Sequence, residues 1–143
     1  MTVKSILAGK GREVVAIEPN ASLSAAVALL AQKRIGALLV LGADGRIVGI
    51  LSERDIVRVL AEHGSRVLDE PVSQVMTRKV ITCAEHETVA TIMERMTAGK
   101  FRHMPVVDQG RLIGVISIGD VVKQRVLDME HESAAMRDYI ATA

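Results

Sequence analysis

The alternation of apolar and polar residues divides the chain into short strands and amphipathic helices. Apolar residues form short runs at positions 14–17 and 80–83, and each run predicts a strand. A hydroxyl residue then precedes each stretch in which apolar residues recur with helical spacing, Ser22 before Leu23 and Thr88 before Val89. The pattern therefore predicts a helix after each short strand.

A hairpin and a second helix complete each pattern. The turn signal Asp44-Gly45 separates apolar residues 37–41 from 47–51, and Gln109-Gly110 separates 104–107 from 112–116. A helix is predicted to begin after each hairpin, at Ser52 and at Ser117. The order strand, helix, strand, strand, helix thus occurs twice.

The two halves are also similar in sequence. When GRIVGILSERDIV (45–57) is placed over GRLIGVISIGDVV (110–122), six of the thirteen positions are identical and five exchange one aliphatic residue for another. We predict two homologous repeats, residues 1–66 and 67–128, followed by a helical extension at 129–143. Because each repeat has a helix-covered sheet but only a marginal core, we expect the two to share one core. The expected fold is α/β (α+β), with the repeats packed as a pseudo-two-fold pair around a cleft.

Composition excludes several classes of function. The only aromatic residues are Phe101 and Tyr139, and the net charge is +1, so neither base stacking nor a basic surface favours nucleic-acid binding. The single cysteine, Cys83, forms no intrachain disulfide and suits a reducing compartment. No apolar run has the length of a membrane span or a signal peptide. We expect a soluble cytoplasmic protein with no membrane or nucleic-acid partner.

No catalytic motif is visible. The segment His131-Glu132-Ser133-Ala134-Ala135 lacks the second histidine of the metalloprotease pattern. Gly9-Lys10-Gly11-Arg12 lacks phosphate-loop spacing and is interpreted as a flexible lead-in to the first strand. No nucleophile and base are paired. We expect no enzymatic activity, no metal site and no catalytic cofactor.

Two Ser-x-x-Asp segments carry the strongest candidate chemistry, Ser52 to Asp55 and Ser117 to Asp120. One interpretation is structural: the serine caps a helix, and the aspartate favours the positive end of the helix dipole. The other is functional: the carboxylate accepts both ribose hydroxyls, while the serine and the free amides face ribose or phosphate. Duplication in register favours function, and both interpretations can hold for the serines.

The order of elements and the segments GILSERDIV, KFRHMPVV and GVISIGDVV resemble a pair of cystathionine-beta-synthase (CBS) domains, also called a Bateman module. The resemblance extends from about Val3 to Val126. It implies a regulatory module that binds AMP, ADP or ATP and acts on a separate partner protein. NAD and S-adenosylmethionine contain the same adenosine, so the sequence leaves the ligand open among these.

The resemblance also implies two nucleotide sites, each built from both repeats. Site one combines the first turn with residues of the second repeat: Ser52, Arg54, Asp55, Val80, Ile81, Phe101, Arg102 and His103. Site two combines the second turn with residues of the first repeat: Ser117, Asp120, Val14, Val15, Ile35, Gly36 and Ala37.

Arg102 and His103 are the candidate phosphate ligands that the resemblance implies, and the alternative is an exposed surface pair. The first repeat has Gly36 and Ala37 at the matching positions, so site two has no cationic pair of its own. Arg54 and Lys123 are weaker candidates, because each also suits a solvated helix surface.

An apolar stripe near the C-terminus favours association. Val122, Val126, Met129, Met136 and Ile140 follow alternating spacings of four and three residues if Ser133 fills one position. We therefore expect a homodimer. The alternative function that the sequence leaves open is a structural or oligomerisation module with a vestigial ligand cleft.

Overall fold

The computed structural model describes residues 1–142, and the chain forms two compact units. The first unit is Val14–Ile81, and the second unit joins Met1–Glu13 to the chain from Thr82 onward. These units divide the chain differently from the predicted repeats. Residues 1–13, assigned to the first repeat, pack with the second unit, and residues 67–81, assigned to the second repeat, pack with the first.

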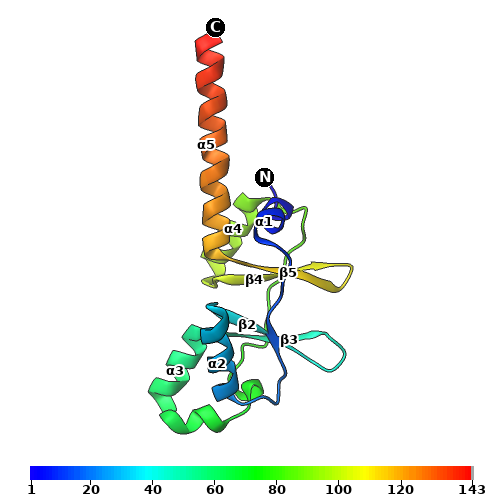
Figure 1. Cartoon of the computed structure of the whole chain (residues 1–143), viewed down its shortest axis with the longest axis vertical. Helices are drawn as coiled ribbons and strands as arrows, with labels where there is room; N and C mark the ends of the chain where they lie inside the picture. Colours follow the sequence, from blue (N-terminus) through cyan, green and yellow to red (C-terminus); the bar gives the residue numbers. More distant parts are fainter. Residues whose placement is uncertain (143) are drawn as a thin grey trace. The chain divides into compact units, whose positions relative to one another are not determined.

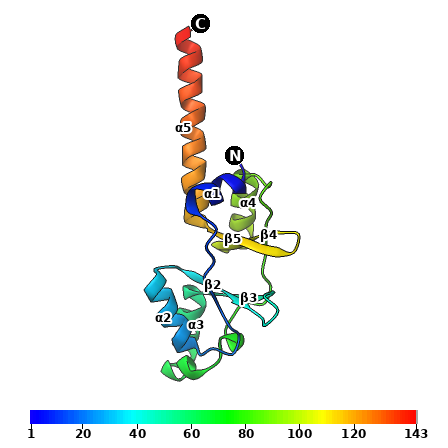
Figure 2. The same cartoon turned by 45° about the vertical axis from the view of Figure 1, so that its right-hand side comes forward.

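The first unit is a small sheet covered by two helices. The strands lie in the order β1-β2-β3, with β1 parallel to β2 and β2 antiparallel to β3. Helices α2 and α3 lie together against the sheet (Figures 1 and 2). The elements in chain order are β1 (Ala16–Ile17), α2 (Leu23–Lys33), β2 (Ala37–Leu41), β3 (Ile47–Ser52), α3 (Glu53–His63) and the short 3₁₀ helices η1 (Ser65–Asp69) and η2 (Val72–Gln74).

The second unit repeats the helix and the hairpin. It contains α1 (Val3–Lys10), α4 (Val89–Gly99), β4 (His103–Asp108), β5 (Arg111–Ser117) and α5 (Ile118–Thr142). The strand predicted at 80–83 is wrong: only Cys83 is bridged, in parallel, to Val106. Residues up to 81 belong to the first unit, so only the end of the run reaches β4.

Local capping explains why the predicted helices begin where they do. The Ser22 hydroxyl accepts a hydrogen bond from the Ala25 amide at 3.1 Å, and Thr88 does the same for Thr91 at 3.1 Å. These bonds satisfy amides that the first turn leaves unpaired. Both predicted helix starts are confirmed.

Helix α1 replaces part of the predicted flexible lead-in. Its residues Val3, Ile6 and Leu7 are buried in the core of the second unit. The helix ends at Lys10, and Gly11 follows with φ 101°, a conformation that suits glycine. The interpretation of residues 9–12 as unstructured was therefore wrong for Gly9 and Lys10.

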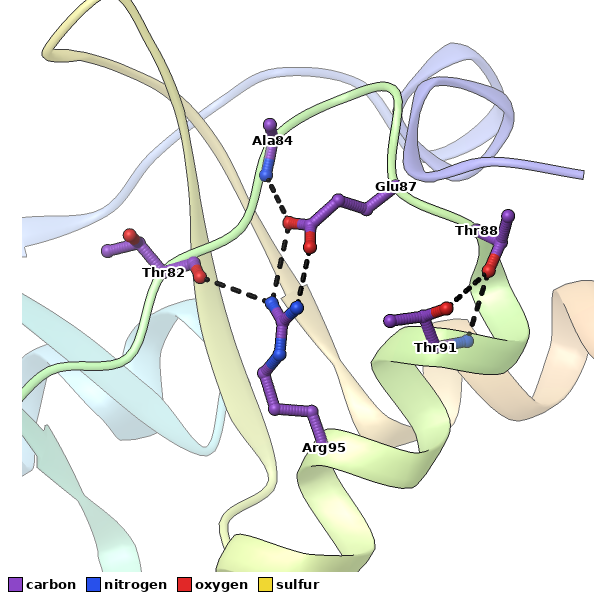
Figure 3. Close-up of polar contacts among 6 residues, drawn as sticks. All are labelled: Thr82, Ala84, Glu87, Thr88, Thr91 and Arg95. Atoms are coloured by element: carbon purple, nitrogen blue, oxygen red, sulfur yellow. Dashed lines mark hydrogen bonds and ion pairs between the residues drawn. The ribbon is translucent and has the colours of Figure 1, made fainter.

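An ion pair fastens the loop before α4 to that helix (Figure 3). Glu87 accepts hydrogen bonds from the Ala84 amide at 2.8 Å and from the Arg95 guanidinium at 2.6 Å. The hydrogen bond from Arg95 lowers the pKa of Glu87. The loop that leads from Thr82 into α4 is thus held by a charged contact as well as by the Thr88 cap.

Helix α5 runs without a break from the end of β5 and continues well past the other helices of the second unit (Figure 1). The helical extension predicted from residue 129 is continuous with the last helix of the second repeat, through Thr142. No helix within residues 1–142 is long and apolar enough to cross a membrane.

Candidate functional site

The first Ser-x-x-Asp turn is a reciprocal cap at the start of α3. The Asp55 Oδ2 atom accepts hydrogen bonds from the Ser52 amide at 3.0 Å and from the Ser52 hydroxyl at 3.1 Å. The Ser52 hydroxyl in turn accepts a hydrogen bond from the Asp55 amide at 3.3 Å. Arg58 reaches the other carboxylate oxygen at 3.2 Å. Asp55 is buried, so these contacts offset the cost of removing its charge from water.

The second turn has the same two contacts with backbone amides, and its cation comes from α1 instead of from the same helix. Asp120 Oδ2 accepts a hydrogen bond from the Ser117 amide at 2.8 Å, and the Ser117 hydroxyl accepts one from the Asp120 amide at 3.2 Å. Lys10, at the end of α1, places its ammonium 2.6 Å from the same Oδ2 atom. The Lys10 ammonium also donates to the Val115 carbonyl at 2.8 Å.

These contacts set the charge of Asp120. Burial acts to raise the pKa of this carboxyl, but the hydrogen bonds from Lys10 and Ser117 outweigh burial and lower the pKa. Asp120 is therefore a stable anion near neutral pH, with side-chain exposure of 25%. A half-buried carboxylate of this kind can accept hydrogen bonds from a diol.

In each unit, the start of the first hairpin strand lies beside the Ser-x-x-Asp turn of the same unit. Ala37 pairs with Ser52, and the Glu53 amide donates to the Gly36 carbonyl at 2.9 Å. In the second unit, His103 pairs with Ser117, and the Ile118 amide donates to the Arg102 carbonyl at 2.8 Å.

Each Ser-x-x-Asp turn therefore lies beside the residues that begin the hairpin of the same unit. In the second unit these residues include the candidate phosphate ligands. The structure brings Arg102 and His103 to Ser117, and Gly36 and Ala37 to Ser52. The sequence resemblance groups Arg102 and His103 with Ser52, and Gly36 and Ala37 with Ser117, across the two repeats, and that grouping stays a prediction.

The other predicted residues differ in exposure. Val14, Val15, Ile35, Val80 and Phe101 are half-buried, whereas Arg54, Ile81, Arg102 and Lys123 are exposed. The apolar members suit the wall of a site for a base, and the exposed cations are accessible to an anion.

A pocket of about 510 Å³ in the first unit contacts part of this set. Ile35 and Gly36 line it together with Glu53, which lies between Ser52 and Asp55 in the chain. The remaining lining comes from α2 and the residue after it: Val27, Leu30, Ala31 and Arg34. The lining thus combines four aliphatic side chains and Gly36 with one acidic and one basic side chain.

The contact of Lys10 with Asp120 was not predicted from the sequence. Lys10 is separated from Asp120 by 110 positions, so no local motif joins them. A usable signal was nevertheless present, because Val3, Ile6 and Leu7 have the spacing of one helical face. Within residues 1–142, no cluster of histidine, cysteine, aspartate or glutamate is arranged to hold a metal ion.

Two solved structures have a similar arrangement of helices and strands. The CBS-domain containing protein ATU1752 from Agrobacterium tumefaciens is 47% identical, with a TM-score of 0.85 over 87% of this chain and 92% of that chain. The CBS domain pair of protein MJ0100, solved in complex with 5'-methylthioadenosine and S-adenosyl-L-methionine, is 27% identical, with a TM-score of 0.79 over 90% and 98% of the two chains.

Sequence comparison gives the same family. An uncharacterized 17.7 kDa protein of Acidianus ambivalens is 32% identical over 78% of this chain and 66% of its own length. The chain spans less than two thirds of the length of the curated relatives that it matches first. The family model described as CBS domain matches twice, at residues 3–62 and 72–126. The chain therefore belongs to the CBS-domain family and carries a pair of these domains.

Proposed function

We propose that this chain is a regulatory module that binds an adenosine-containing ligand and performs no chemistry on it. The observation that carries the proposal is the duplicated Ser-x-x-Asp turn, in which both units fix an aspartate at the end of a strand by the same two backbone contacts. A capping box accounts for the serine and the acid of one turn, but its repetition beside the start of a neighbouring strand in both repeats favours a shared ligand-binding role.

In this proposal Asp55 and Asp120 each accept the hydroxyls of a ribose. A vicinal diol presents two donors, which matches a carboxylate whose position is already fixed by its own helix. The half-buried aliphatic residues Val14, Val15, Val80 and Ile35 contact the base. Backbone groups and aliphatic walls can hold a base without an aromatic partner, so the scarcity of aromatic residues is no obstacle.

Phosphate binding belongs to the second unit in this proposal. Arg102 is exposed and lies beside the Ser117 turn, so it can pair with a phosphate through two parallel hydrogen bonds. The matching position of the first unit is Gly36, which offers no cation. AMP, ADP or ATP would therefore gain affinity over adenosine mainly from Arg102, with His103, Arg54 and Lys123 as further candidate ligands.

Relatives support the ligand class. The CBS domain pair of protein MJ0100 was solved with two adenosine-containing molecules. A match of 26% identity, over 88% of this chain, is the gamma-3 subunit of the 5'-AMP-activated protein kinase of Bos taurus. These proteins favour adenosine as the shared part of the ligand, and the choice among AMP, ADP, ATP, NAD and S-adenosylmethionine is a matter for measurement.

Calorimetric titration with adenosine, AMP and ATP tests the proposal. Asp120→Asn should weaken all three ligands about tenfold to hundredfold at the affected site, because each loses a charge-assisted ribose contact. Arg102→Met should weaken AMP and ATP more than adenosine. Arg111→Met, an exposed arginine at the start of β5, is the matched control and should change no affinity. Parent-like binding by Asp55→Asn and Asp120→Asn alike would refute the ribose assignment.

A second function, oligomerisation without a ligand, is favoured by the exposed apolar residues of α5, among them Met129 and Ile140. Thermal unfolding in the presence of the ligand panel distinguishes the two. A ligand that binds the folded state raises the midpoint as its concentration rises. A midpoint that no member of the panel changes would favour the structural function.

A further inference from the structure

Helix α5 has one face packed against the second unit and another with no partner in that unit. Val121 and Asp128, seven residues apart, are buried, and Gln124 between them donates to Asp128 at 3.0 Å. This spacing of seven marks one stripe of the helix as the face that contacts α1 and α4.

The unpartnered face is apolar along its whole length. Its large residues are between 46% and 66% exposed and follow spacings of four and three, with Ser133 at the one polar position: Val122, Val126, Met129, Met136 and Ile140. In heptad notation Val126, Ser133 and Ile140 are a positions, and Val122, Met129 and Met136 are d positions. The buried Val121 and Asp128 are c positions, which lie well away from this a/d face.

The residue types at these positions favour packing against an identical helix from a second copy of the chain. Val126 and Ile140 at a are β-branched, and two of the three d residues, Met129 and Met136, are unbranched, which suits two-stranded packing. A single exposed apolar residue needs no partner, but a continuous stripe of this length on one helix does.

The charges beside the stripe select an orientation. The charged residues at the flanking e and g positions are Lys123, Arg125, Glu130, Glu132 and Arg137. In a parallel pair in register, each g residue meets the e residue five positions later on the other helix. Arg125 then faces Glu130 of the second copy, and Glu132 faces Arg137, so all four contacts of the symmetric pair join opposite charges.

An antiparallel pair of full overlap reverses these signs. It brings Glu130 against Glu130, Glu132 against Glu132, and Lys123 against Arg137. An antiparallel pair shifted towards the start of α5 restores opposite charges, but it leaves Met136 and Ile140 uncovered. Only the parallel register satisfies both the charges and the apolar stripe.

We propose that α5 is a dimerisation helix that forms a parallel, in-register, two-stranded coiled coil with α5 of a second copy of this chain. The contact is symmetric, as a closed two-fold dimer requires. It does not depend on nucleotide binding, so it can hold or fail independently of the proposed function.

Charge reversal in the full chain tests the contact and its direction together. Analytical ultracentrifugation of the parent should report twice the 15.4 kDa chain mass. Glu130→Arg should weaken the dimer about tenfold, because it turns two attractive contacts into repulsive ones. Adding Arg125→Glu should restore the parent affinity. Asp138→Arg makes the same charge change at an f position, away from the stripe, and should leave the dimer unchanged.

The double variant separates the parallel pair from the shifted antiparallel one. In the antiparallel pair, Arg125→Glu with Glu130→Arg creates repulsion at both contacts and weakens the dimer further. A monomeric parent at micromolar concentration would overturn the proposal, as would a dimer that Glu130→Arg leaves unchanged. A dimer that the second substitution fails to rescue would overturn the parallel orientation.

A cross-link provides an independent readout. Met136→Cys places identical d residues against each other in the parallel pair, so mild oxidation should give a covalent dimer. Ala135→Cys lies at a c position and should not cross-link. The native Cys83 is buried, and burial raises the pKa of its thiol to about 12, which keeps it out of the reaction. Equal cross-linking of both variants, or of neither, would contradict the arrangement.

Discussion

Asp55 stabilises its own helix with the carboxylate that we propose as a ribose acceptor. Its Oδ2 atom accepts two hydrogen bonds from Ser52, and the residue is buried. Any substitution that removes ribose binding therefore also removes a cap. The structural and functional interpretations of this motif are not alternatives, because one carboxylate has enough lone pairs for both.

We predict that Asp55→Ala lowers the free energy of unfolding by about 1–2 kcal/mol, because the reciprocal cap is lost and the Ser52 amide is left without this partner. Urea unfolding monitored by circular dichroism measures the change. Glu53→Ala removes an exposed acid from the same first turn and should cost less than about 0.5 kcal/mol. Equal losses for the two variants would mean that the cap contributes nothing beyond the helix dipole.

Lys10 gives Asp120 a pH-dependent contribution to stability. The pKa of Asp120 is lowered in the folded chain, so its contribution is fully present above the ordinary aspartate pKa of about 4 and is lost as pH falls through the lowered value. Lys10→Met should therefore reduce the free energy of unfolding by about 0.5–1 kcal/mol at neutral pH and by less under acid conditions.

Urea unfolding at several pH values checks this behaviour. The part of the Lys10 effect that comes from its bond to the Val115 carbonyl should persist at all pH values. In an Asp120→Asn background, the effect of Lys10→Met should no longer depend on pH. A pH-dependent effect that survives in that background would assign it to another acid.

At the scale of elements, matched glycines in the two hairpins accommodate different neighbours. Gly49 in β3 and Gly114 in β5 occupy equivalent positions of the two repeats. A Cβ atom on Gly49 would lie 2.5 Å from the Met76 sulfur and 3.0 Å from the Thr77 carbonyl oxygen. On Gly114 it would lie 2.7 Å from a Leu7 methyl carbon.

We predict that Gly49→Ala destabilises the chain by about 1–3 kcal/mol and more than Gly114→Ala does. The Thr77 carbonyl is hydrogen-bonded to the Ile50 amide at 2.9 Å and cannot move freely, whereas the end of a leucine side chain can. Gly9→Ala, in α1 with open space around the new methyl, should instead be neutral or stabilising. Denaturant midpoints of the three variants give the order, and a costlier Gly114→Ala would refute it.

Some helices and strands could be predicted from the sequence alone, and others could not. Capping residues such as Ser22 and Thr88 act over three positions, so the helix starts were predictable, and the repeat predicted both hairpins. The packing of α1 in the second unit was not predictable from local patterns, because its partners are about one hundred residues away. Short runs such as 80–83 fail for a related reason: a strand needs a neighbour within reach, and only Cys83 has one.

The candidate site was predictable to a similar degree. Both Ser-x-x-Asp turns were identified from spacing alone, and the structure gives them the same cap. The contact of Lys10 with Asp120 depends on how α1 packs, so no motif contained it. The nearness of Arg102 to Ser117 follows from the register of β4 with β5, which the sequence specified only through the turn at Gly110.

At the scale of the whole molecule, each unit has its own apolar core. The expectation that the two repeats share one core was therefore wrong. The core of the second unit includes three residues of α1, and Leu7 is among its most buried members with an exposure of 1%. Residues from the start of the chain therefore stabilise elements from its second half.

Leu7→Ala should lower the free energy of unfolding by about 2–4 kcal/mol, because the cavity forms in a packed core. Hydrogen exchange should accelerate in α4, β4 and β5, while the amides of β2 and β3 change less, since their core contains no α1 residue. Val72→Ala, at an equally buried position of the first unit, should show the opposite distribution. Equal acceleration across both units in either variant would show that the cores unfold together.

The continuity of α5 has a mechanical consequence. Its first turn contains Asp120 and its far end contains Ile140, so an unbroken helical rod of about 30 Å joins the two. Such a rod acts as a lever whose arm is several times the size of a side chain. A tilt of about a tenth of a radian at the carboxylate would displace the far end by about 3 Å, roughly half a helical turn.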